Sequence, residues 1–321
     1  MPETFAPSAE LSADDLARCR EILRAGSKSF DAAGRLLPPR LRGPIAALYA
    51  FCRVADDDVD LVAAGGRAAA VDALAARLDA AYLGRPADHA VDRAFSAIVR
   101  GYRIPRAIPD ALIEGFRWDV EGRRYETFGD VCAYAARVAS TVGVMMTLLI
   151  GERSALVLSR AADLGIAMQL TNIARDVGED ARDGRVYLPV AWLREAGLSA
   201  DALVSAPRAS DALRGVVRRL LSRADALYAR ADGGLSLLPA DARVAMTAAR
   251  LVYADIGREI AAADFDSVSR RASTTTARKA ALLALAPLRG VLPRAVSHAP
   301  TEPEAAFLVD AVLRADADAR W

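Results

Sequence analysis

Two acidic clusters inside apolar segments constrain this chain more than any other feature. The first reads Asp56-Asp57-Asp58-Val59-Asp60 and the second Asp176-Val177-Gly178-Glu179-Asp180, so each places two aspartates four residues apart. On a helix, this spacing puts both carboxylates on one face. Two such helices facing each other form a cage of oxygen ligands suited to divalent cations that hold a diphosphate. The clusters therefore predict two opposed helices around a polar centre.

Other residues, most of them polar, continue each acidic face along its helix. Tyr49 and Arg53 share the face of the first cluster, and Gly165, Gln169 and Asn172 share the face of the second, each beside an apolar stripe. An acidic stripe is usually a solvated surface. Here the flanking segments are unusually apolar and poor in lysine, and the pattern occurs twice. Carboxylates crowded in an apolar bundle take up protons, and divalent cations remove that cost.

Two arginines lie within these helices. A guanidinium binds two phosphate oxygens at once, so Arg53 and Arg175 are candidates for holding a diphosphate. The alternative is that each is a structural ion-pair partner of the neighbouring aspartates, and the sequence favours this more for Arg175 than for Arg53.

The rest of the chain reads as helical throughout. The chain of 321 residues is 53% hydrophobic but only 6% aromatic, which favours closely packed helices. Hydrophobic periodicity predicts helices over residues 12–25, 41–60, 67–82, 91–102, 109–120, 128–150, 155–180, 211–231, 240–263 and 276–285. Glycine and proline mark the expected joints, among them Gly233-Gly234 and Pro287, with a loop over 293–304 before a terminal helix. No long linker divides the chain, so we expect one all-α domain over residues 1–321, with a flexible N-terminus and a C-terminal extension.

Composition excludes several functional classes. The net charge of +1 argues against a nucleic-acid footprint. The two histidines, His89 and His298, lie far from the clusters in sequence, which argues against zinc, serine-triad and di-iron chemistry. Nucleotide-binding glycine motifs are absent from the sequence. Three cysteines without metal-like spacing and a start without signal-peptide character indicate a cytoplasmic protein. The longest apolar run, Val138–Gly151, is too short for a membrane span and reads as a buried helix.

An ordered set of motifs resembles the head-to-head prenyl synthases, the family of squalene, dehydrosqualene and phytoene synthases. The matching stretches cover about residues 16–285 and are 26–30, 48–60, 122–128, 134–143, 168–180 and 183–189, with a weaker match from Tyr253 to Lys279. The resemblance is greatest to the bacterial phytoene-forming members. It implies an all-α isoprenoid synthase bundle in which two prenyl diphosphates bind around one central cavity.

The resemblance also implies roles for individual residues. The metal ligands it implies, for Mg²⁺ with Mn²⁺ as the alternative, are Asp56, Asp57, Asp60, Gln169, Asn172, Asp176, Glu179 and Asp180. The catalytic residues are Asp56, Asp60, Asp176, Asp180, Arg53 and Tyr134. The substrate-binding residues are Ser27, Lys28, Ser29, Phe30, Tyr49, Arg53, Val138, Ala139, Gly143, Gly165, Gln169, Asn172, Arg175, Tyr253 and Arg270.

The implied reaction joins two geranylgeranyl diphosphates through a cyclopropylcarbinyl diphosphate to phytoene, without NADPH. Such apolar substrates and products imply peripheral contact with a membrane and with enzymes of carotenoid biosynthesis. The alternatives are a C15-using enzyme that makes dehydrosqualene, hydroxysqualene or squalene, a terpene cyclase, and a non-enzymatic bundle that binds metal or a partner through its acidic faces.

One middle segment departs from the family pattern. Ser140 stands where the family usually has glycine, and its hydroxyl is expected to bond to a carbonyl one turn earlier. With Ala136, Ala139 and Gly143 it forms a thin helical face. A thin face either leaves room for an isoprenoid chain or serves close helix packing, and the residues alone favour packing.

Overall fold

The computed structural model describes residues 11–292 and 294–319, and within this part of the chain it contains helices and no strand. The α-helices are α1 Ala13–Gly26, α2 Lys28–Gly34, α3 Pro39–Asp60, α4 Arg67–Tyr82, α5 Ala90–Gly101, α6 Ala107–Val120, α7 Phe128–Ala135, α8 Thr141–Ile150, α9 Ala155–Arg182, α10 Val190–Glu195, α11 Ala200–Ser205, α12 Asp211–Leu235, α13 Ala240–Ala262, α14 Thr276–Val291 and α15 Ala306–Asp318. Three short elements are η1 Ala64–Gly66, the π-helix η2 Ala136–Ser140, and η3 Pro303–Ala305. Residues 1–10, which belong to the N-terminus predicted to be flexible, and Pro293, at the start of the predicted loop, lie outside the described part.

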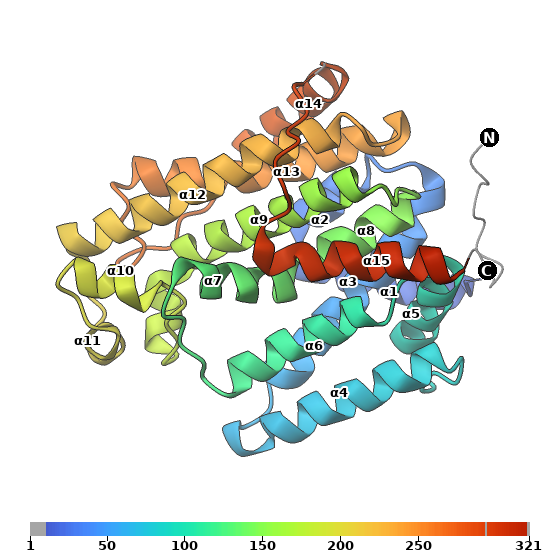
Figure 1. Ribbon diagram of the computed structural model, residues 1–321, viewed down its shortest axis with the longest axis horizontal. Helices are drawn as coiled ribbons and strands as arrows, with labels where there is room; N and C mark the ends of the chain where they lie inside the picture. The colour runs from blue at the N-terminus through green and yellow to red at the C-terminus, as the bar shows by residue number, and fades with distance from the viewer. Residues whose placement is uncertain (1–10, 293, 320–321) are drawn as a thin grey trace.

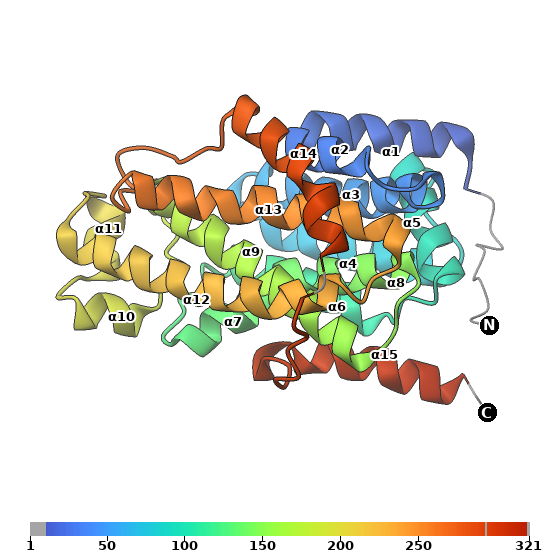
Figure 2. The ribbon, with the colours of Figure 1, turned by 90° about the horizontal axis from the view of Figure 1, so that it is seen from above.

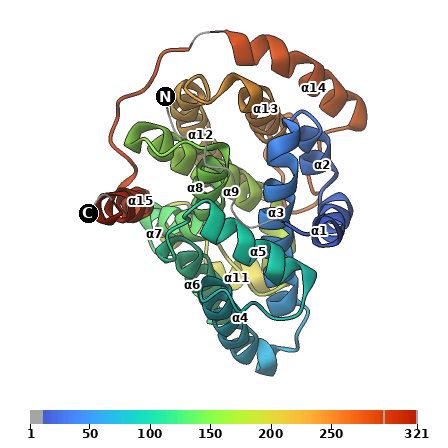
Figure 3. The same ribbon diagram turned by 90° about the vertical axis from the view of Figure 1, so that its right-hand side faces the viewer.

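Helix α9 runs through the middle of the bundle (Figure 1). It packs against α7, η2, α8, α12, α13 and α15. Seen end-on, α3 and α1 lie on one side of it and α15 on the other (Figure 3). The length of α9, 28 residues, gives it a reach of about 42 Å, so one helix carries both the second acidic cluster and the opposite end of the cavity described below.

Local sequence explains where several helices begin. Thr127 and Asp130 form a reciprocal capping box at the start of α7. The Ser154 hydroxyl caps α9, and the Ser210 and Thr275 hydroxyls cap α12 and α14 in the same way. Nearly all the predicted long helices are confirmed within a few residues. The short α2, α10 and α11 were not predicted, because six or seven residues carry too little periodicity.

Two predicted joints are wrong. Gly233 and Gly234 lie inside α12, where a Cβ on Gly234 would sit 2.2 Å from the Cβ of Arg160 and one on Gly233 would sit 2.6 Å from the Ala295 carbonyl. These glycines serve close packing and not a turn. Pro287 lies inside α14, which continues beyond it because Ala286 and Gly290 pack on α13 (Figure 2).

The predicted helix over 128–150 is interrupted by η2. Gly115 of α6 and Gly165 of α9 approach it so closely that a Cβ on either would lie 2.6 Å or 2.5 Å from η2 atoms. The Ser140 hydroxyl donates to the Ala162 carbonyl at 2.7 Å, on α9 and not one turn earlier as expected. Residues Phe128–Ile150 are long and apolar enough to cross a membrane, but 61% of their most apolar window is buried inside the protein, as expected for a core helix.

Candidate functional site

A cavity of about 820 Å³ lies between α3 on one side and α9 and α13 on the other. Its lining is mostly apolar, including Leu48, Met146, Leu164 and Met168. Nine residues that the sequence analysis assigned to substrate binding line it: Phe30, Tyr49, Val138, Ala139, Gly143, Gly165, Gln169, Asn172 and Tyr253. The thin face of the middle segment is therefore divided, since Ala139 and Gly143 line the cavity while Ala136 and Ser140 are fully buried.

The other expected substrate-binding residues lie outside this lining. The Ser27 hydroxyl accepts a hydrogen bond from the Phe30 amide and caps α2. Lys28 is exposed, and the side chain of Ser29 lies outside the described part of the structure. The Phe30 ring lies between two tyrosines, with centroids 5.9 Å from Tyr49 and 5.4 Å from Tyr253. Helix α2 therefore supplies one aromatic wall near the polar end of the cavity.

The first acidic cluster forms the last turns of α3. Arg53 donates to Asp57, with Nε 3.0 Å from Oδ2, and its Nη1 lies 3.8 Å from Asp56. Arg185, which follows α9, donates to Asp60 at 2.9 Å. Burial, followed by repulsion from Asp60, raises the pKa of Asp56 to about 6.

The second cluster occupies the last turns of α9. Arg175 and Arg271 both donate to Asp176, at 2.7 Å and 2.8 Å, and Arg271 also lies 3.1 Å from Glu179. Burial acts to raise the pKa of Asp176, but these hydrogen bonds outweigh it and hold the pKa below its usual value. For Asp180, burial followed by repulsion from Asp176 raises the pKa to about 7.

Arg185 joins the two clusters electrostatically. It acts on the carboxyl groups of Asp56 and Asp180 as well as on its direct partner Asp60. The ends of α3 and α9 therefore face one another across a shared guanidinium, which agrees with the predicted opposition of the two helices. The alternative considered for Arg53 and Arg175 is also present, since each is paired with an aspartate.

Tyr134 does not line the cavity. It is buried, and its hydroxyl donates to Asp119 at 2.9 Å, while the Tyr187 hydroxyl donates to the other oxygen of Asp119 at 2.7 Å. The two rings stack with centroids 5.0 Å apart. Burial raises the pKa of Asp119 to about 6, against the opposing effect of the two tyrosine donors. Arg185 acts on Asp119 too, so this tyrosine pair adjoins the acidic clusters.

The polar residues fit a divalent cation by their chemistry. Asp56 and Asp180 have raised pKa values, as expected of carboxylates that a cation would keep ionised. The buried Oδ1 of Asn172 has no hydrogen-bond partner, although its Nδ2 donates to Gln169. Within the described ranges, however, no three Asp, Glu, His or Cys side chains converge as a metal-binding group. Several carboxylates are turned onto arginines, so holding a cation requires them to exchange partners.

The sequence analysis missed three polar residues beside the clusters: Asp119, Arg185 and Tyr187. The matched stretch 183–189 contained two of them, but no spacing argument assigned them a role. Arg271 was passed over in favour of its neighbour Arg270, yet Arg271 makes the contacts with Asp176 and Glu179. Adjacent arginines in a loop cannot be told apart by periodicity.

Comparison with known proteins gives a consistent result. The model of the squalene/phytoene synthase family matches residues 23–278. A phytoene synthase of Rhodobacter capsulatus is 52% identical over 303 residues, covering 92% of this chain and 89% of the relative. A phytoene synthase of Cereibacter sphaeroides is 50% identical, covering 95% of this chain and 90% of the relative. The crystal structure of a dehydrosqualene synthase with ligand superposes with a TM-score of 0.78 at 31% identity, covering 85% of this chain and 95% of that one.

Proposed function

The chain belongs to the squalene/phytoene synthase family, and we propose that it joins two geranylgeranyl diphosphates head to head to form phytoene and two diphosphates. It is a prenyltransferase. The observation that carries the proposal is an apolar cavity whose polar end, at Gln169 and Asn172, continues along α9 into the second acidic cluster. Hydrocarbon chains enter such a cavity, while their diphosphates stay at the acidic end.

The cavity is long enough for C20 chains. The lining residues of α9 extend from Asn172 to Val157, fifteen residues that rise about 22 Å. A geranylgeranyl chain has about 15 main-chain bonds at roughly 1.2 Å each, which gives about 18 Å when extended and fits within this length. A farnesyl chain is about 5 Å shorter on the same scale and would leave more of the far end unfilled.

The reaction begins with ionisation of one allylic diphosphate. The residues proposed to hold divalent cations, Mg²⁺ or Mn²⁺, are Asp56, Asp57, Asp60, Gln169, Asn172, Asp176, Glu179 and Asp180. Such cations neutralise the developing charge on the leaving diphosphate. Arg53 and Arg175, freed from Asp57 and Asp176, then bind diphosphate oxygens through their guanidinium groups. The apolar lining excludes water, which would otherwise capture the cation.

The double bond of the second substrate attacks the allylic cation, and loss of a proton closes a cyclopropane ring. A second ionisation releases the other diphosphate, the ring rearranges, and loss of a second proton forms the central double bond. The first diphosphate is the proposed proton acceptor, because Tyr134 lies outside the cavity lining and donates its hydroxyl to Asp119. The positions of the two chains determine the product, since both must meet at the carbons that carried the diphosphates.

The product is proposed to leave toward a membrane surface. Five exposed apolar residues belong to segments that meet near the start of α13: Leu36, Leu237, Leu288, Val291 and Leu292. Their proximity follows from the Arg40–Asp241 ion pair, which ties the start of α3 to α13, and from the packing of Gly290 on Val244. Leu37 and Leu238, next to two of them in sequence, line the cavity. A lipid surface is the partner that suits an apolar patch beside the end of a hydrocarbon cavity. The carotenoid-pathway enzymes that supply substrate and take up phytoene are proposed to work at that surface, with the protein otherwise in the cytoplasm.

A product assay tests the proposal. Purified protein receives geranylgeranyl or farnesyl diphosphate with Mg²⁺ and without NADPH, against an EDTA control. We expect a metal-dependent C40 hydrocarbon from the C20 substrate. A C30 product from the C15 substrate alone would keep the family and overturn the substrate, and no product from either would overturn the activity.

A further inference from the structure

The exposed part of the cavity lining consists almost entirely of arginine. Five lining residues are exposed, and the rest are buried or half-buried: the five are Arg20, Arg24, Arg35, Pro39 and Arg42. They belong to α1, to the residue after α2 and to the start of α3, and α1 packs on both of the other helices. The cavity therefore reaches the surface between these three helices, at an opening that we call the arginine mouth.

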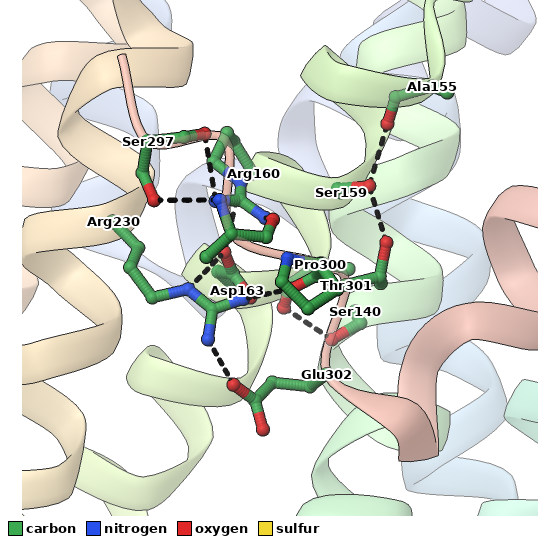
Figure 4. A network of polar contacts seen from close by, with 12 residues as sticks. Ser140, Ala155, Ser159, Arg160, Asp163, Arg230, Ser297, Pro300, Thr301 and Glu302 are labelled. Atoms are coloured by element: carbon green, nitrogen blue, oxygen red, sulfur yellow. Dashed lines mark hydrogen bonds and ion pairs between the residues drawn. The ribbon is translucent and has the colours of Figure 1, made fainter. Parts of the chain in front are cut away.

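The side of the cavity between α9 and α12 is covered. Arg160, the remaining arginine of the lining, is buried, and its guanidinium donates to the carbonyls of Ser297 at 3.1 Å and Ala299 at 2.8 Å (Figure 4). Arg230 of α12 pairs with Glu302 at the other end of the same segment. Because the segment before α15 lies over this side, an apolar product has its path to the surface at the arginine mouth.

The arginine mouth carries an excess of positive charge. Arg42 donates to the carbonyl of Arg35 at 3.0 Å, which holds its guanidinium at the turn between α2 and α3. Arg35 pairs with Asp31, another lining residue, at 2.9 Å. Arg20, Arg24 and Arg42 form no ion pair with a carboxylate of the described residues. Four arginines against one aspartate leave three positive charges available to an anionic partner.

The arginine mouth adjoins the exposed apolar patch. Leu36, one of the five exposed apolar residues, directly follows Arg35. Ala33 of α2 packs in one cluster with Ala249 of α13 and Ala286 of α14. Helix α2 accordingly lies between α1 on one side and α13 with α14 on the other (Figure 3). The guanidinium groups and the exposed apolar side chains thus border the same opening.

From this arrangement, and resting on the proposed function, we propose that the arginine mouth binds the headgroups of anionic phospholipids and holds the cavity opening against the membrane. A guanidinium binds two phosphate oxygens at once. A basic residue close to an anionic leaflet strengthens membrane binding by about fivefold. Asp56 lies fourteen residues beyond Arg42 on α3, about 21 Å along the axis, so the acidic clusters stay away from the lipid. A C40 hydrocarbon would then pass from the cavity into lipid without crossing water.

The test measures binding of the full-length protein, without substrate, to two kinds of vesicle by co-sedimentation. One kind is phosphatidylcholine alone, and the other also contains phosphatidylglycerol. Wild type should prefer the anionic vesicles by on the order of 100-fold, from three charges at about fivefold each. Raising the salt from about 0.05 M to about 0.5 M should remove most of that preference. Equal binding of wild type to both kinds of vesicle would overturn the proposal.

A pair of variants separates the position of the charges from their number. Arg20→Gln with Arg24→Gln should weaken binding to anionic vesicles by about 25-fold and leave binding to neutral vesicles unchanged. The control, Arg208→Gln with Arg314→Gln, removes two exposed arginines that lie outside the cavity lining and pair with no carboxylate of the described residues. It should bind anionic vesicles within about twofold of wild type. Equal losses in the two variants would overturn the assignment to the arginine mouth.

A prenyl diphosphate is another amphiphile with an anionic head. If the arginine mouth served it instead, Arg20→Gln with Arg24→Gln would raise KM for geranylgeranyl diphosphate in detergent and would bind vesicles as wild type does. That result would overturn the lipid assignment. Because vesicle binding is measured without substrate, a failure to form C40 product would refute the proposed function separately.

A fluorescent label tests which face meets the lipid. Gly34 lines the cavity, and a Cβ there would meet no atom of another segment within 4 Å, so Gly34→Cys accommodates a label. Burial raises the pKa of the native thiols of Cys19, Cys52 and Cys132, which slows their labelling near neutral pH. A polarity-sensitive label at Gly34→Cys should brighten on anionic vesicles, whereas one at Leu83→Cys, an exposed position after α4, should not. A label that stays dim at Gly34→Cys in vesicle-bound protein would overturn the proposal.

Discussion

Replacing Asp180 by asparagine should stabilise the metal-free protein while abolishing its response to Mg²⁺. Burial and the nearby Asp176 raise the pKa of Asp180 to about 7, against about 3.9 for an unfolded aspartate. A pKa difference of about 3, at roughly 1.4 kcal/mol for each pH unit, corresponds to a free-energy difference of about 4 kcal/mol. Because Asp180 is only partly shielded from water, we expect Asp180→Asn to raise the free energy of unfolding by about 2 to 4 kcal/mol.

The sign of the effect defines the pH window. The folded state binds the proton more tightly than the unfolded state, so this contribution to stability is complete below about pH 4 and is lost as pH rises to about 7. At pH 7.5 in EDTA, Asp180→Asn should therefore be more stable than wild type, whereas near pH 4 the two should be equal. A gain of this size corresponds to a rise in melting temperature of about 5 °C.

The assay is thermal unfolding followed by circular dichroism, across this pH range, with EDTA or with Mg²⁺. Mg²⁺ should raise the melting temperature of wild type and leave that of Asp180→Asn nearly unchanged. Asp310→Asn, an exposed aspartate on α15, is the control and should behave as wild type. If Asp180→Asn is no more stable than wild type in EDTA at pH 7.5, the reasoning from burial and repulsion is wrong.

Three further outcomes follow from the same geometry. Asp56→Asn and Asp176→Asn should each lower C40 formation by orders of magnitude with an unchanged circular dichroism spectrum, and near-full activity in either would remove that cluster from the metal site. Arg53→Ala should raise KM and lower kcat, because the diphosphate loses a guanidinium; unchanged kinetics would leave Arg53 as an ion-pair partner of the aspartates only. Leu288→Ser with Val291→Ser should weaken co-sedimentation with phospholipid vesicles by several-fold, and equal sedimentation would exclude that patch from membrane contact. The control is Leu83→Ser, at another exposed leucine directly after α4.

The helices were predictable because their signals are local. Hydrophobic periodicity, capping residues and helix-breaking residues determine where an element such as α3 or α9 begins and ends. Gly233 and Gly234 show the limit, because glycine marks both turns and close approaches, and only the position of a partner such as Arg160 decides between them. The Ser140 hydroxyl illustrates the same limit, since its acceptor belongs to another helix.

The residues of the candidate site were likewise predictable where they share one helix, and not where they come from different segments. The aspartates and the lining residues of α9 are spaced on single helices, so one sequence is enough to group them. Asp119 could not be assigned to the site, since its partners Tyr134 and Tyr187 come from two other segments of the chain. The ion pairs among Arg160, Asp163, Arg230 and Glu302 could not be predicted for the same reason, because they join α9, α12 and the segment before α15.

The π-helix η2 changes the direction in which side chains point before and after it, and so sets the orientation of two parts of the site. Each extra residue in a helix turns everything beyond it by about 100°. Tyr134, before η2, faces Asp119, while Val138, Ala139 and Gly143, within or beyond it, face the cavity. Deleting one residue here would restore a regular α-helix and rotate the residues before η2 relative to those after it. The same residues would be present, but they would no longer face Asp119 and the cavity together. A family member with one residue fewer in this segment would therefore need a different tyrosine partner to reach the same arrangement.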